Sequence, residues 1–123
     1  MKNKTVTIDG VEYVRADSIS STAKAEQLDG MDYVIVRTYS AGVHAGYLKS
    51  RKGKEVVLVN ARRIWYWSGA STLSQLAMEG VKNPSECKFP CPVSEIILTE
   101  AIEIIPCTED ARKNIQEVWV WKQ

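Results

Sequence analysis

Several residue types on which common function classes depend are scarce in this sequence. It has one histidine and one phenylalanine in 123 residues, and its formal net charge is +1. A single histidine leaves little scope for acid–base catalysis, although His44 remains available to act alone. The balance of sixteen basic and fifteen acidic side chains argues against a dedicated duplex-DNA-binding domain, which is usually strongly basic.

Long apolar runs and metal-binding patterns are also missing. No stretch reaches the roughly 18 apolar residues of a membrane-spanning helix, and no apolar signal-peptide region follows Met1. We therefore expect a cytoplasmic protein with no membrane partner. The three cysteines, Cys87, Cys91 and Cys107, are expected to be reduced, and they lack the nearby histidine or fourth ligand of a zinc site.

Catalytic motifs are absent too. The sequence has no Gly-x-Ser-x-Gly elbow, Walker A loop, dinucleotide fingerprint or His-Glu-x-x-His helix. It predicts a binding protein rather than an enzyme, with no catalytic residue, cofactor or metal. The length indicates one domain.

The most distinctive stretch present is Asn60–Gly69, which combines two arginines with three aromatic rings. Arginine side chains match phosphate geometry, and Trp and Tyr offer flat surfaces to a purine. The stretch therefore suits a phosphorylated nucleotide; the alternative is a buried strand with core tryptophans and arginines that reach out to water. If the stretch is extended, alternation places Arg62, Ile64 and Tyr66 on one face and Arg63, Trp65 and Trp67 on the other.

Residues 1–30 are predicted to be an extension of a module that spans 31–123. Thr5–Arg15 has the pattern of a β-hairpin around an Asp-Gly turn. The following segment fits either a short helix from Asp17 to Gly30 or a linker.

The module itself is predicted to be α+β, an antiparallel β-sheet of about six strands with two short helices. Ser71 or Thr72 is the candidate N-cap of the first helix and Thr108 that of the second, and Gly80 is a candidate stop for the first. In the tail, Trp119 and Trp121 are expected on one face of a last strand, as a lid on the core or an oligomer contact. The other strands are expected within 32–40, 47–49, 55–60 and 93–106.

Two features allow two interpretations each. The small residues of Ser40–Gly46 have backbone amides that suit an anion, but the same composition fits a tight hairpin connection. Phe89, held before a proline and beside a lysine, fits either base stacking or a place in the core.

Three strings carry a family resemblance: Tyr33–Tyr47, Asn60–Ala70 with Thr72 and Leu73, and Leu98–Cys107. From about Asp32 onward the chain resembles a family of small bacteriophage and prophage proteins, the first Thoeris anti-defence sponge proteins. The resemblance implies binding of cyclic ADP-ribose isomers (glycocyclic ADP-ribose) that bacterial TIR-domain enzymes make on infection. It implies that the signal is held intact, so that the Thoeris effector stays inactive in the infected host.

The resemblance also implies a homodimer or higher oligomer with the ligand at a subunit interface, and in some members separate sites for cyclic oligonucleotides. Residue chemistry then assigns candidate ligand contacts: arginines for phosphates, an aromatic ring for adenine, and an amide side chain with a small-residue loop for ribose and phosphate. The candidates for the phosphates are Arg37, Arg62, Arg63 and Arg112. The candidate for adenine is Phe89 or Trp67, and the candidates for ribose and phosphate are Asn60 with Ser40, Ala41, Gly42 and His44.

Two other functions remain open at this stage. One is a hydrolase of the same signal, which would need a metal or a base such as His44. The other is a phage module that binds single-stranded nucleic acid, with steep salt dependence and length-dependent affinity.

Overall fold

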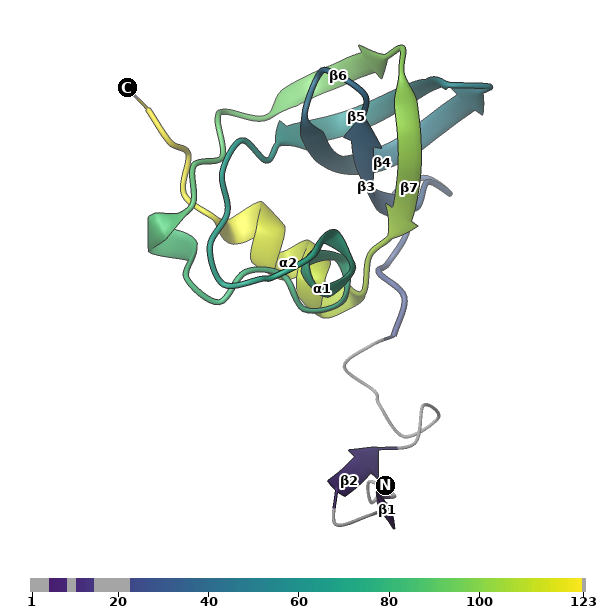
Figure 1. Ribbon diagram of the computed structural model, residues 1–123. Helices are drawn as coiled ribbons and strands as arrows, with labels where there is room; N and C mark the ends of the chain where they lie inside the picture. Colours follow the sequence, from purple (N-terminus) through teal and green to yellow (C-terminus); the bar gives the residue numbers. More distant parts are fainter. Residues whose placement is uncertain (1–4, 9–10, 15–22, 123) are drawn as a thin grey trace.

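The computed structural model describes residues 5–8, 11–14 and 23–122 (Figure 1). Two helices and a five-stranded antiparallel sheet of order β6-β5-β4-β3-β7 form the module, which confirms the predicted α+β class. The strands are β3 (Tyr33–Thr38), β4 (Val43–Lys52), β5 (Glu55–Arg63), β6 (Val93–Leu98) and β7 (Ala101–Pro106). The two α-helices are α1 (Leu73–Glu79) and α2 (Glu109–Glu117), and a short 3₁₀ helix, η3 (Pro84–Glu86), lies between them in the chain.

The N-terminal hairpin is confirmed as a separate two-stranded sheet of β1 (Thr5–Ile8) and β2 (Val11–Val14). Its Asp-Gly turn lies outside the described residues. So do residues 17–22 of the proposed helix from Asp17, and the part that is described, 23–30, is not helical. Instead this segment joins the module, because the Ala25 amide donates to the Cys107 carbonyl at 3.1 Å.

The sheet is strongly curled. β6 and β7 lie at its opposite edges, yet only Thr99 and Glu100 connect them, and Figure 1 shows β6 running directly into β7 at one corner. The curl encloses a small core of Val34, Val36, Val56, Leu58, Ala61 and Leu98.

Irregular pairing between β4 and β5 explains much of the curl. Their register shifts twice, and Asn60 takes a left-handed backbone conformation with φ of 51°. Extra residues of this kind bend a strand and increase its twist. At the first shift Gly46 approaches β5 so closely that a Cβ there would lie 3.0 Å from the Ala61 Cα.

The helices cover the other face of the sheet. Thr72 and Thr108 cap them as predicted, since their hydroxyls accept hydrogen bonds from the Gln75 and Ala111 amides. The larger core lies between these layers and combines Tyr33, Ile35, Ala45, Tyr47 and Ile64 with Leu76, Ala77, Phe89, Ala111 and Ile115, among others.

Two local predictions were wrong. The tail is not a strand: Val120 makes one isolated parallel bridge with Phe89, because Pro90 and Pro92 in the neighbouring segment supply no amide donors. The connection after β3 is also shorter than Ser40–Gly46, since β4 already begins at Val43. Within the described part of the chain, no helix is long and apolar enough to cross a membrane.

Two glycines with positive φ differ in how closely other backbone approaches them. Gly69 has a φ of 94°, and a Cβ there would lie 2.4 Å from the Lys82 nitrogen, whereas Gly53, with a φ of 62°, has nothing within 4 Å. We expect Gly53→Ala to cost about 1 kcal/mol of unfolding free energy through backbone strain alone. Gly69→Ala adds backbone overlap and should cost at least about 3 kcal/mol in urea denaturation; equal costs would contradict the close approach.

Candidate functional site

Neighbouring arginines on β5 lie on opposite faces of the sheet. Arg62 is 5% exposed and lies with buried Ile64 on the helix-covered face, while Arg63 is exposed on the other face. The alternation expected for these three residues is therefore confirmed. β5 ends at Arg63, so Trp65 and Trp67 do not continue the pattern.

Arg62 is bound by backbone carbonyls. Its NH1 donates to the Ile115 oxygen at 3.0 Å, and its NH2 and Nε donate to the Phe89 and Pro90 oxygens at 3.4 Å each. Its guanidinium carbon lies 5.3 Å from the centre of the Phe89 ring. No carboxylate of the described residues pairs with it, and burial lowers its pKa. A guanidinium carries more N–H groups than these three bonds use, so Arg62 retains donors.

A cavity of about 270 Å³, the Arg62 pocket, adjoins this guanidinium and is lined by Tyr33, Asn60, Arg62, Pro92 and Gln116. The Tyr33 ring is 2% exposed and its hydroxyl is buried without a hydrogen-bond partner. Burial raises the pKa of this hydroxyl, so it is a neutral donor at physiological pH. The pocket thus combines a buried cation, a free hydroxyl and two amide side chains.

Arg112 lies beside this pocket but is already engaged. It forms an ion pair with Glu109, and its NH1 donates to the Gln116 Oε1 at 2.9 Å and to the Tyr47 hydroxyl at 3.5 Å. The Gln116 Nε2 also donates to that hydroxyl, at 3.2 Å. Arg112 therefore orients Gln116 at the edge of the Arg62 pocket.

A second cavity, the His44 pocket, lies on the opposite face of β5. Its volume is about 230 Å³, and the Ala41 carbonyl beside it accepts from the His44 Nε2 at 2.9 Å and from the Arg63 NH1 at 2.8 Å. His44 is fully buried, and its Nδ1 has no partner. Burial is the main reason that the pKa of His44 is lowered. The pocket is lined by His44, Ala61, Arg63, Pro90, Cys91, Val93 and Ile96.

The loop before His44 uses its polar groups internally. The Ala41 amide donates to the Thr38 hydroxyl at 2.8 Å, and the Gly42 carbonyl accepts from the Thr38 amide at 3.0 Å. The Ser40 hydroxyl donates to Glu100 at 3.0 Å. The structure therefore supports the hairpin interpretation of this loop rather than an anion cradle built from its amides.

The remaining candidates do not meet. Arg37 is exposed and forms an ion pair at 3.4 Å with Glu103, which is its register partner on β7. Phe89 is fully buried, so its place is in the core. Trp67 is partly buried, and its Nε1 donates to the Ala70 carbonyl at 3.1 Å. Phe89 therefore offers no open face to adenine, and Trp67 is only partly exposed.

The exposed aromatic rings lie elsewhere. Trp65 and Trp121 stack with centres 5.2 Å apart, and the Lys88 ammonium lies 5.4, 5.9 and 5.6 Å from the centres of Trp65, Tyr66 and Trp121. We call this arrangement the Lys88 cage. Sequence analysis missed it, because only the bridge between Tyr66 and Lys88 brings the lysine to these rings.

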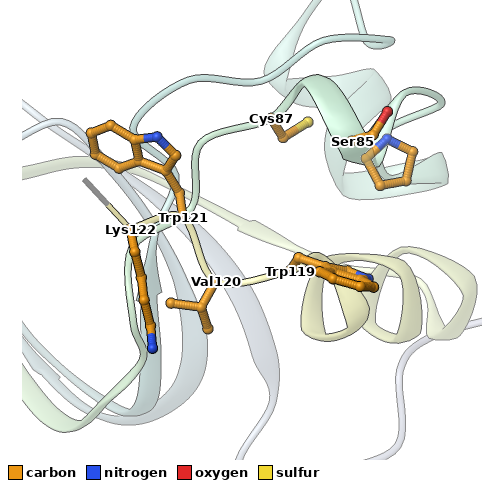
Figure 2. A pocket seen from close by; sticks show the side chains of 7 residues that line it. Ser85, Cys87, Trp119, Val120, Trp121 and Lys122 are labelled. Carbon is orange, nitrogen blue, oxygen red and sulfur yellow. The ribbon is translucent and has the colours of Figure 1, made fainter.

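The tail also borders a cavity of about 580 Å³ (Figure 2). Figure 2 shows Trp119 and Trp121 apart, on either side of Val120, so the expected pair of tryptophans on one face is not formed. Trp119 is 87% exposed. Across the part of the chain that the structure describes, Cys87, Cys91 and Cys107 are free and no three potential metal ligands cluster.

The Lys88 cage should stabilise the tail. Removing the ammonium with Lys88→Met is expected to lower the unfolding free energy by about 1 kcal/mol and to speed chymotrypsin cleavage near Trp119 and Trp121. Exposed Lys82, in the same loop, provides the control variant Lys82→Met. Identical stability and cleavage in both variants would contradict a role for the cage.

Glu109 should make the folding stability depend on pH in the acidic range. Hydrogen bonds from Arg112 and from the Glu26 amide lower the pKa of Glu109 to about 2 in the folded protein. Its stabilising effect is present above its ordinary pKa and is lost as pH falls toward 2. As pH falls from the ordinary pKa of a glutamate toward 2, we expect the melting temperature of Glu109→Gln to fall less than that of the wild type. The control is Glu117→Gln, which changes an exposed glutamate. Parallel wild-type and Glu109→Gln curves would contradict the assignment.

Comparison with known proteins places the chain in a family. A family model described as a domain of unknown function, DUF6948, matches residues 31–115. No curated protein and no solved structure gives a significant match. The matched region contains Lys88, the whole lining of the His44 pocket and that of the Arg62 pocket except Gln116, and it ends before Trp119 and Trp121. Because the match spans well over half of its length, the chain belongs to the DUF6948 family.

Proposed function

We propose that this protein binds a small phosphorylated nucleotide and sequesters it intact. Following the resemblance above, the proposed ligand is a cyclic ADP-ribose isomer made by bacterial TIR enzymes, bound in the cytoplasm of an infected bacterium so that the Thoeris effector is not activated. The observation that carries the proposal is the Arg62 pocket, which is lined by a buried guanidinium without a carboxylate partner and by Tyr33, whose hydroxyl has no hydrogen-bond partner.

The chemistry of this pocket favours a phosphate. A buried cation without an opposite charge is costly, and an anion that reaches it gains strength from the low local dielectric. Phosphate oxygens accept charge-assisted hydrogen bonds from a guanidinium, and they also accept from a tyrosine hydroxyl. Asn60 and Gln116 add amide donors at the rim.

The size of the pocket indicates that it holds only part of the ligand. At about 270 Å³ it lies below the range of about 300–1,000 Å³ that is usual for whole small-molecule sites. The base and riboses would then lie outside the pocket, against a second surface. A second copy of the chain supplies such a surface in the proposed homo-oligomer, and the exposed Trp65, Tyr66 and Trp119 provide aromatic area for it.

Sequestration is a better fit than hydrolysis. The single histidine lies on the face of β5 opposite to Arg62, so His44 is not placed to act on a phosphate in the Arg62 pocket. Inhibition by binding needs a slow release rate and enough protein, and not turnover. Guanidinium, hydroxyl and amide donors are sufficient for that purpose.

The test combines ligand recovery with a hydroxyl deletion. The purified protein is mixed with the product of a TIR enzyme, freed of small molecules by filtration and heated, and the released material is analysed by mass spectrometry. We expect intact cyclic ADP-ribose isomer. Tyr33→Phe should bind it at least about fivefold more weakly, with folding unchanged, because the deleted hydroxyl has no partner in the folded protein.

Tyr39→Phe is the matched control, since Tyr39 is 77% exposed and does not line the pocket. Depletion of the signal with nothing intact released would indicate the hydrolase instead. Absence of depletion would refute the proposal, and affinity for oligodeoxythymidine that grows with length and falls steeply with salt would favour the nucleic-acid-binding module. Unchanged binding by Tyr33→Phe would move the ligand away from the Arg62 pocket.

A further inference from the structure

The His44 pocket has the features of a second ligand site. Its floor is formed by the fully buried His44 and Ala61, and its mouth is bordered by the exposed Arg63, Cys91 and Val93. The pocket is therefore open to solvent at one end, and it is lined by a histidine whose buried Nδ1 has no hydrogen-bond partner.

The hydrogen bond to Ala41 fixes the role of that atom. A carbonyl oxygen only accepts, so the His44 Nε2, 2.9 Å from the Ala41 oxygen, carries the ring proton. Burial lowers the pKa of His44, which keeps the ring neutral. The buried Nδ1 is consequently a lone-pair acceptor that requires an N–H or O–H donor.

Arg63 supplies the complementary group. Its NH1 and the His44 Nε2 share the Ala41 oxygen, at 2.8 and 2.9 Å, so the guanidinium and the imidazole lie side by side. A guanidinium has further N–H donors for a ligand acceptor. Apolar Ala61, Val93 and Ile96 complete the walls.

This combination excludes simple ions. A metal cation at Nδ1 would be repelled by the neighbouring guanidinium, and a simple anion would satisfy Arg63 but offer no proton to Nδ1. A ligand that satisfies both groups carries a donor and an acceptor next to each other. A flat apolar body would also match the walls and the volume of about 230 Å³.

We propose that the His44 pocket binds a compact planar ligand through an edge that places an N–H donor beside an acceptor, the pattern shared by aromatic carboxamides and adenine-type bases. The N–H group donates to the His44 Nδ1, and the acceptor receives from Arg63. This site is distinct from the Arg62 pocket, since it lies on the other face of the sheet.

The single histidine makes the test specific. In protein labelled with ¹⁵N-histidine, only His44 contributes imidazole signals, and the probes are benzamide and adenine. We expect at least one probe to shift the Nδ1 resonance at millimolar concentration or below. Its N-methylated analogue, N,N-dimethylbenzamide or N6,N6,9-trimethyladenine, lacks every N–H donor and should bind at least about tenfold more weakly. The pair that shows this difference identifies the source as a carboxamide or a base.

Cys91 gives an independent readout, because it lines the pocket and is exposed while Cys87 and Cys107 are buried. The bound probe should slow alkylation of Cys91. Arg63→Gln should weaken binding, whereas Arg37→Gln, an exposed arginine outside the pocket, and Tyr33→Phe should not. The proposal would be overturned if neither probe bound, or if a probe and its N-methylated analogue bound equally well.

Discussion

The buried side chain of Arg62 is the contact on which the arrangement of the module depends. It extends from β5 and donates to carbonyls of two other segments, Phe89 and Pro90 in the loop before β6 and Ile115 near the end of α2. The last carbonyls of a helix lack intrahelical donors and carry partial negative charge. Arg62 therefore adds a second donor to the Ile115 carbonyl, which also accepts from the Val118 amide, and it holds the loop that contains Phe89 against the core.

This same contact explains why a cation can serve a binding site and the fold together. Backbone carbonyls have partial charges only, so they orient the guanidinium without neutralising it. The positive charge remains without a carboxylate partner, and Arg62 lines a pocket together with Tyr33. A carboxylate partner in the core would have stabilised the arginine equally well but removed its value for a phosphate.

The curl of the sheet creates two sites from one short stretch of sequence. Alternation on β5 sends Arg62 and Arg63 to different faces, and the irregular pairing around Asn60 and Gly46 bends those faces into different surroundings. One arginine becomes buried beneath α2, and the other borders an open pocket with His44. Two residues of equal chemistry thus acquire different surroundings, one buried and one exposed.

Local sequence determined the elements and the direction of the β5 side chains. Thr72 and Thr108 predicted both helix starts because capping depends on neighbours in the chain, and alternation predicted that Arg62 and Arg63 separate. Local patterns also predicted Ala41, His44 and Arg63 as candidate ligand contacts, and in the structure the Ala41 oxygen accepts hydrogen bonds from both other side chains.

Only tertiary structure decided which faces are covered. Phe89 fills the core while Trp65 and Trp119 are exposed, although all three are large rings that periodicity treats alike. Tyr33 and Gln116 were missed as pocket residues, and Lys88 as the centre of the cage, because their partners are remote in the chain. The sequence by itself determined the helices and strands of the module and the facing of the β5 side chains, which follow from short-range geometry, but not the conformation of the tail. The pockets arose from packing, which depends on how distant segments meet.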